Sequence, residues 1–238
     1  MDPVVVFELR GSVAHFRRPD TLGTHASYPF IPRTALRGLI AGVLGLDGPE
    51  LLPVAARCGV QLLSPVQTVA QELSLHGKKW VGAGTNESFH RPTSIELVVN
   101  PHYRIFSTGP HAEELSDRLE RRQSVYHTYL GSAFCLTFPE WKRFELGDPV
   151  PVGGGAMICA TVVPAPAIGR LDLSTGRAYA RVGGVSLTAL GERRYRGTTA
   201  VVYDPVGGPV TFSPAVRPED AFWEFRRMPG EEGVVCLW

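Results

Sequence analysis

The sequence predicts an α+β protein in two parts, a mixed domain over residues 1–147 and a smaller β-rich region over residues 148–238. Three observations lead to this prediction. Short β-branched segments that end at glycine or proline recur along the chain, which is typical of strands. Two segments carry apolar residues at helical spacing, and both lie in the first part. The 26 glycines and 20 prolines among 238 residues are spread out as turns, with no tandem repeat.

The first part has the element order β-α-β-β-α-β. Its expected strands and helices are, in chain order, a strand at 4–9, a helix at 32–46, strands at 60–73 and 93–107 (bent at Pro101), a helix at 112–122, and a strand supplied by 134–138 and 144–146. Pro32 suits the first turn of its helix because its missing N–H needs no partner there, and Gly45 suits the end. This order is that of ferredoxin-like domains, which include RNA-recognition motifs.

The second part contains short segments that are typical of strands. After a turn-rich boundary at 147–155, strands are expected at 157–163, 178–185, 198–203 and 210–212. They form either a second small sheet or an extension of the first.

Composition excludes several classes of protein. The content of 44% hydrophobic and 20% charged residues is that of a globular protein, not of a disordered chain. The net charge is +1 and the pI about 7.8, below the pI of roughly 9 that marks many free-standing nucleic-acid binders, so a basic site must be local. The longest apolar stretch, 39–46, is too short to cross a bilayer, and Asp2 near the start argues against a signal peptide. We expect no membrane association.

Motifs for metals and cofactors are missing from the sequence. The four cysteines, Cys58, Cys135, Cys159 and Cys236, form no CxxC pair, so neither a zinc site nor a disulfide framework is expected, and a cytoplasmic location is the default. The sequence has no Walker loop, HExxH motif, nucleophile elbow or dinucleotide-binding fingerprint. We therefore expect no cofactor and no metal.

Three segments are candidates for binding an anionic polymer. The first surrounds the start of the first helix, where free N–H groups favour anions and arginines add bidentate phosphate contacts; its candidates are His15, Arg17, Arg18, Tyr28, Arg33 and Arg37. Because Arg33 and Arg37 are four residues apart, they are expected to share one helix face, within reach of Arg17 and Arg18. The alternative is a solvated basic face with ordinary ion pairs, and composition does not separate the two.

The second candidate segment, 74–92, interleaves cations with aromatic residues. Such a mixture suits single-stranded RNA, because cations pair with phosphates while bases stack on rings. Its candidates are His76, Lys78, Lys79, Trp80, His90 and Arg91. The alternative is an irregular hairpin whose aromatic side chains pack on the core.

The third candidate segment is SVYHTYLG, residues 124–131, with Tyr126 and Tyr129 three apart. Tyr129 is retained as a binding candidate. The alternative, which we favour for Tyr126, is a helix end packed by two tyrosines.

Four stretches in these regions resemble one protein family. They are FELRGSVAHFRRP, SYPFIPRTALRGLIAGVLGL, NPHYRIF and SVYHTYLGSAF. Their order and spacing are similar to the CRISPR-associated RAMP family "Cas five", the subunit that binds the crRNA 5′ handle in type I Cascade. The match is strongest over 28–46, then over 126–131, and the last third of the chain matches only in its strand-rich character.

The resemblance implies a fold and partners. It implies an RNA-recognition-motif-like RAMP domain with a β-hairpin thumb at about 74–92, which would wedge at the junction of handle and spacer. The implied partners are the crRNA 5′ handle, the Cascade backbone RAMP subunit, the large subunit, and target DNA near the PAM. This division of labour fits guide-directed targeting, in which base pairing reads sequence and protein reads backbone and shape.

The resemblance also raises the question of catalysis. One branch of the family cuts precursor crRNA without metal and carries a Tyr-Lys-His constellation. Tyr28 stands near the corresponding tyrosine position, but no adjacent Lys-His pair matches. We expect a non-catalytic crRNA-binding subunit; the alternative is a metal-independent endoribonuclease that processes precursor crRNA.

Overall fold

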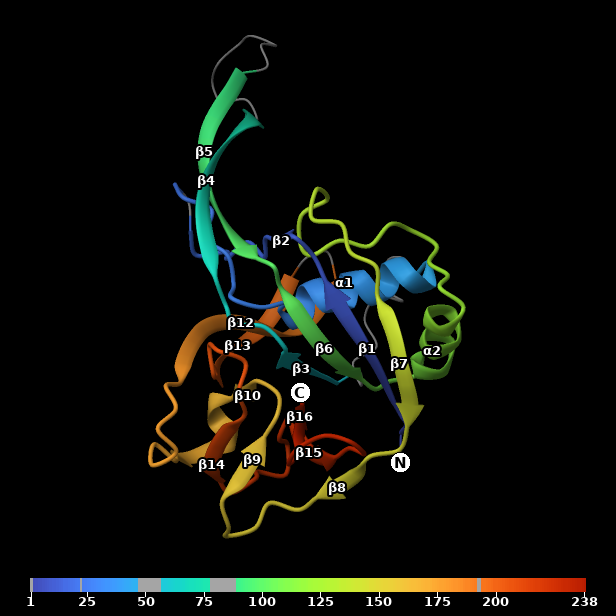
Figure 1. Cartoon of the computed structure of the whole chain (residues 1–238), viewed down its shortest axis with the longest axis vertical. Helices are drawn as coiled ribbons and strands as arrows, with labels where there is room; N and C mark the ends of the chain where they lie inside the picture. The colour runs from blue at the N-terminus through green and yellow to red at the C-terminus, as the bar shows by residue number, and fades with distance from the viewer. Residues whose placement is uncertain (1, 22, 47–56, 78–88, 192–193) are drawn as a thin grey trace.

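A computed structural model describes residues 2–21, 23–46, 57–77, 89–191 and 194–238. Strands dominate it, and two α-helices occur among the described residues (Figure 1). No helix in this part of the chain is long and apolar enough to cross a membrane. In chain order the elements are β1 (Val4–Arg10), β2 (Val13–Ala14), α1 (Arg33–Leu44), β3 (Cys58–Leu62), β4 (Thr68–Gly77), β5 (Phe89–Val99), β6 (His102–Ser107), α2 (Ala112–Glu120), β7 (Glu140–Glu145), β8 (Asp148–Val150), β9 (Met157–Cys159), β10 (Val163–Pro164), the 3-10 turn η2 (Ala165–Ala167), β11 (Ile168–Leu171), β12 (Ala180–Gly191), β13 (Arg194–Tyr203), β14 (Val210–Pro214), β15 (Glu224–Arg227) and β16 (Val235–Leu237).

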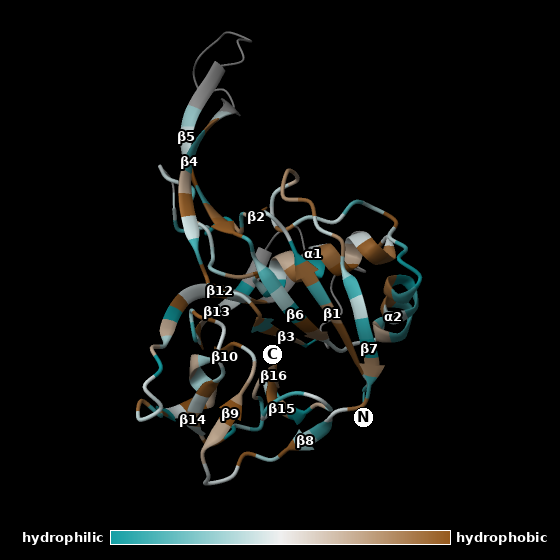
Figure 2. Ribbon diagram, in the orientation of Figure 1, coloured by the Kyte–Doolittle hydropathy of each residue, from teal (hydrophilic) through white to brown (hydrophobic). Residues whose placement is uncertain are grey.

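The largest sheet has four strands in the order β3-β6-β1-β7, each antiparallel to its neighbours. Successive side chains of β1 face opposite sides of the sheet. Phe7 is buried in the main core with α1 and α2, whereas Val6 packs on the other side with Met228 and Val235. β1 is hydrophobic over most of its length and edge strand β7 is largely hydrophilic (Figure 2). The strand VVVF therefore lacks polar alternation because it is covered on both faces.

Helix α1 has the predicted limits to within two residues. Pro32 is its N-cap, and Gly45 ends it with a φ of +75°, a conformation that glycine adopts without strain. Its predicted apolar face packs against the sheet: Leu36, Leu39, Val43 and Leu44 are buried and Ile40 is half-buried. In α2, Leu115 and Leu119 are buried.

Two long predicted strands are each divided between two sheets. The segment 60–73 was expected to be one strand, but β3 ends before Pro65 and β4 begins after it. The segment 93–107 was expected to be one bent strand, but β5 and β6 are separated at Asn100, with a φ of +47°, and Pro101. Proline has no N–H to donate to a ladder, so both prolines interrupt pairing rather than bend it. β3 and β6 stay in the main sheet, while β4 and β5 form a hairpin that projects from the body of the molecule (Figure 1).

The predicted strand at 134–138 is wrong. This segment is a turn that makes only an isolated bridge between Tyr129 and Leu136, and the strand next to β1 is β7. Side chains do alternate in it, but Cys135 and Thr137 face inward, and the Thr137 hydroxyl donates to the carbonyl of Arg10 at 2.7 Å. The large apolar residues Phe134 and Phe138 face solvent instead. Alternation alone did not reveal which set of side chains is buried.

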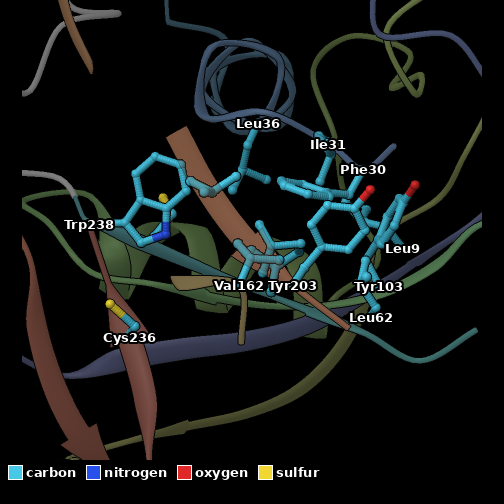
Figure 3. Packing of buried hydrophobic residues seen from close by; sticks show 14 of the residues in the cluster. Leu9, Phe30, Ile31, Leu36, Leu62, Tyr103, Val162, Tyr203, Cys236 and Trp238 are labelled. Carbon is cyan, nitrogen blue, oxygen red and sulfur yellow. The ribbon is translucent and has the colours of Figure 1, made fainter. Parts of the chain in front are cut away.

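The second part of the chain forms three small sheets, ordered β10-β13-β12, β11-β14-β9 and β16-β15-β8. Strands β11, β15 and β16 were not predicted. The boundary segment contributes β8, which pairs with β15. One continuous core joins both parts: Figure 3 shows Trp238 and Tyr203 packed beneath α1 with Phe30 and Leu36. At the sheet edge, Cys58 and Trp238 exchange both main-chain hydrogen bonds, each 3.1 Å long.

Candidate functional site

An open groove with a volume of about 1,090 Å³ runs along α1. It exceeds the roughly 300–1,000 Å³ of ordinary small-molecule pockets, so its size suits part of a polymer. Five regions line it: the loop before α1, one face of α1, the 126–134 turn, and single residues of β5 and β12. The lining residues are His15, Phe16, Arg17, Pro19, His25, Tyr28, Pro32, Thr34, Ala35, Gly38, Leu39, Ala41, Gly42, Leu46, Ile95, Tyr126, His127, Thr128, Tyr129, Gly131, Ser132, Phe134 and Ser186.

Glu96 of β5 fixes the loop that forms one wall. Its carboxylate accepts from the main-chain N–H of Ser27 at 2.9 Å, and its carbonyl accepts from His15 Nδ1 at 2.8 Å. The Ser27 hydroxyl in turn accepts from the N–H of Phe16 at 3.0 Å. The His15 and His25 rings stack with centroids 6.4 Å apart. One residue at the base of the β4–β5 hairpin therefore holds this wall in place.

The 126–134 turn supplies an aromatic wall. Tyr126 is 62% exposed, Tyr129 45% and Phe134 54%. Tyr126 was expected to pack a helix end, which is wrong: its ring lines the groove. The turn reaches the loop because Gly131, with a φ of +87°, lies against the carbonyl of His15. Exposed rings that line an open groove are suited to stacking on nucleobases.

Helix α1 presents small residues to the groove. Gly38 and Gly42 lie on this face, and a Cβ added to either would meet no atom within 4 Å. The helix backbone is therefore open to close approach by a ligand. Pro32 provides no side-chain cap, and the first turn holds no acidic residue to compete with an anion.

Tyr28 joins the groove to the second part of the chain. Its hydroxyl donates to the carbonyl of Gly184 on β12 at 2.7 Å, and burial raises the pKa of the phenol. The guanidinium of Arg18 lies over the Tyr28 ring, 5.8 Å from its centroid.

The predicted cluster of four arginines is not present. Arg17 is exposed on the groove and makes no ion pair with a described residue. Arg18 is bound to Asp20 at 2.7 Å, and this hydrogen bond raises the pKa of Arg18. Arg37 points to the other side of α1, where it lines a small apolar pocket with Leu115.

Arg33 is buried, contrary to expectation, with only 8% of its surface exposed. Its guanidinium lies 5.7 Å from the centroid of the Trp238 ring, and burial lowers the pKa of Arg33 to about 10. The four-residue spacing of Arg33 and Arg37 predicts one shared helix face beside Arg17 and Arg18. Trp238, far away in sequence, covers the first of them, so Arg33 does not reach the groove.

The second candidate segment lies partly outside the described residues, which exclude Lys78, Lys79 and Trp80. His76 and His90 stand opposite each other in the β4–β5 register, and Arg91 follows on β5. The paired strands begin at Thr68 and run to Val99, so the hairpin is longer than the predicted excursion at 74–92.

A family model described as CRISPR-associated protein (Cas_Cas5) matches residues 4–154, more than half of the chain. The match spans β1, α1, the β4–β5 hairpin and the aromatic turn. The chain belongs to the Cas5 family. This membership confirms the resemblance found in the sequence.

Solved structures share the fold of this Cas5 chain. One, described as a CRISPR RNA-guided surveillance complex, covers 91% of this chain and 95% of its own, with 16% identity and a TM-score of 0.56. A CRISPR protein from Archaeoglobus fulgidus covers 98% of both chains, with 11% identity and a TM-score of 0.57. A chain of a Type III-B Cmr-beta complex bound to cognate target RNA and AMPPnP covers 88% and 86%, with 9% identity and a TM-score of 0.50. No curated protein sequence matches the chain.

Several groove residues of this Cas5 chain escaped sequence reasoning. His25 and His127 lie within or beside segments already singled out, so the mixture of histidine and aromatic residues was an available signal. Ser186 comes from the second part of the chain, and no local pattern marks it. Among the described residues, no group of three or more His, Cys, Asp or Glu side chains is placed to hold a metal ion, and all four cysteines are buried free thiols.

Proposed function

We propose that this Cas5 chain is a non-catalytic subunit of a type I CRISPR effector complex and binds the crRNA 5′ handle in the groove beside α1. The observation that carries the proposal is that His15, Arg17 and Tyr28 of the first candidate segment and Tyr129 of the third line one groove. A free arginine, exposed rings and an accessible helix backbone are suited to a single RNA strand, because they offer a phosphate contact, stacking surfaces and room for close approach.

We also propose a ferredoxin-like fold for the first part of the chain. The elements β1-α1-β3-β6-α2-β7 are assigned to a ferredoxin-like, RNA-recognition-motif type of domain, in which α1 and α2 cover one face of the sheet. The β4–β5 hairpin is assigned as the thumb at the junction of handle and spacer. The proposed protein partners are the backbone RAMP subunit and the large subunit, with target DNA near the PAM. Similarity in fold to a chain from an RNA-guided surveillance complex supports this assembly.

Binding is tested with the purified chain and a single-stranded RNA of the 5′-handle sequence. Tyr129→Ala should weaken binding by about 1–3 kcal/mol, the usual loss on removing one stacking ring, without changing the melting temperature. Phe138→Ala is the matched control, because Phe138 is an exposed ring (59%) near the same turn that does not line the groove. Equal loss in both variants would place the RNA elsewhere, and absence of binding by the unaltered chain would refute the proposal.

Two properties of Tyr28 support binding over cleavage. A general base works best with a pKa near the working pH, whereas burial raises the pKa of Tyr28 above its usual value near 10. The Tyr28 hydroxyl is also engaged as a donor to Gly184. We therefore expect no cleavage of precursor crRNA, with or without divalent metal. Cutting at one site, abolished by Tyr28→Phe, would instead support the endoribonuclease alternative.

A further inference from the structure

The β12–β13 hairpin borders the groove at Ser186 and carries cations that the sequence motifs did not include. It is attached to the groove by the Tyr28 hydroxyl, which donates to Gly184 of β12. Ser186, two residues further along β12, lines the groove directly. β12 is therefore adjacent to a ligand held there, and β13 is its paired neighbour.

The pairing register shows which side chains share the groove side of this hairpin. In an antiparallel pair, residues directly opposite each other face the same side, and residues two apart along a strand do so as well. Ser186 is opposite Thr198, and Thr188 is opposite Arg196. Arg196 is thus on the same side as Ser186, about 7 Å further toward the hairpin tip. The opposite side carries Val185, which is buried in the core.

Arg196 is available for binding. It is exposed and makes no ion pair with a described residue. Gly197 beside it is also exposed. Arg17 lies on the loop before α1 and Arg196 lies on β13; both are exposed, and neither makes an ion pair with a described residue.

We propose that Arg196 of the β12–β13 hairpin binds a phosphate of the same RNA strand that the groove holds, so that the strand contacts both the loop before α1 and the β12–β13 hairpin. This inference rests on the proposed function and adds a contact from the second part of the chain. RNA is favoured as the occupant because the Ser186 side of the hairpin is continuous with the groove and its rings. A contact to phosphate positions the strand and is independent of base sequence.

The test measures binding of a mixed-sequence single-stranded RNA at several salt concentrations. Arg196→Ala should weaken binding about tenfold and reduce the slope of log affinity against log salt by about 0.7, the value for one phosphate contact to a single strand. Arg196→Lys should retain most of the binding, and Arg196→Glu should lose more than Arg196→Ala. All three should melt like the unaltered chain, because Arg196 is exposed. Arg227→Ala is the matched control, since Arg227 is an exposed arginine on β15 without an ion pair to a described residue.

The outcomes separate this inference from the proposed function. If Arg17→Ala and Tyr129→Ala weaken RNA binding but Arg196→Ala behaves like Arg227→Ala, the groove binds RNA and the β12–β13 hairpin does not. If Arg196→Ala weakens binding of duplex DNA and leaves RNA binding unchanged, the hairpin serves a different ligand and the inference is wrong. If the unaltered chain binds no RNA, both proposals fail.

Discussion

Replacement of Gly131 by alanine should destabilise the protein and distort the groove. Gly131 has a φ of +87°, and an added Cβ would approach the carbonyl oxygen of His15 far more closely than any real contact allows. The next nearest atoms are the His15 carbonyl carbon at 2.8 Å and a ring carbon of Phe16 at 2.9 Å. Main-chain atoms of the neighbouring loop must therefore move.

The size of the effect follows from two contributions. A left-handed conformation costs a residue with a Cβ about 1–2 kcal/mol, and overpacking a tight contact costs about 1–3 kcal/mol. Moving His15 also strains its main-chain hydrogen bond to Leu130, which is 3.1 Å long. The loss of unfolding free energy should be about 2–5 kcal/mol, which lowers the melting temperature of a chain this size by about 5–15 °C.

Thermal unfolding followed by circular dichroism measures this change. Gly38→Ala is the control, because Gly38 lies inside α1 and its added Cβ would meet nothing within 4 Å. Alanine favours helix over glycine by up to about 1 kcal/mol, so this variant should melt at the same temperature or slightly higher. The Gly131 variant should also bind RNA more weakly, since His15 and Phe16 line the groove. Melting of Gly131→Ala at the temperature of the unaltered chain would refute the argument.

Two further predictions concern buried charges. Burial alone would raise the pKa of Glu8, but hydrogen bonds from Arg104, His102 and Arg10 and the charge of Lys142 outweigh it and lower the pKa from 4.5 to about 2. Glu8 therefore contributes stability that is present above pH 4.5 and lost as the pH falls toward 2. Glu8→Gln should lower the unfolding free energy by about 2–3 kcal/mol at pH 7 and flatten the pH–stability curve between pH 4.5 and 2. An unchanged curve would contradict this. Arg33→Ala should lower the unfolding free energy by about 2 kcal/mol through its lost contact with Trp238, whereas Arg37→Ala should change it by no more than about 0.5 kcal/mol. Denaturant unfolding measures both. Equal values would show that the Trp238 contact is unimportant.

The sequence was sufficient to predict elements whose limits depend on residues close together in the chain. Pro32 and Gly45 mark the ends of α1 because each acts on its own segment of backbone, and β1 is readable from its apolar run. The divisions at Pro65 and Pro101 were missed because a proline only shows that pairing is interrupted. Whether the chain then bends or enters another sheet depends on which strands lie beside it.

The candidate site was predictable in its parts but not in its assembly. His15, Tyr28 and Tyr129 were found because cations and rings gather in their segments. Their meeting depends on contacts of Glu96, Gly131 and Gly184, which hold distant segments together. The burial of Arg33 by Trp238 has the same origin, since the two are brought together only by the folded chain.

The contact between Cys58 and Trp238 closes an edge of the main sheet. β3 is its outermost strand, and a strand in that place offers unpaired N–H and C=O groups to any extended chain. Here the Cys58 groups are taken by Trp238, and the carbonyl of Val60 accepts from the N–H of Val162 at 2.8 Å. Both partners come from the second part of the chain, so that part shields the first from self-association. During synthesis β3 emerges long before its cover, so its outer edge is unpaired in that interval.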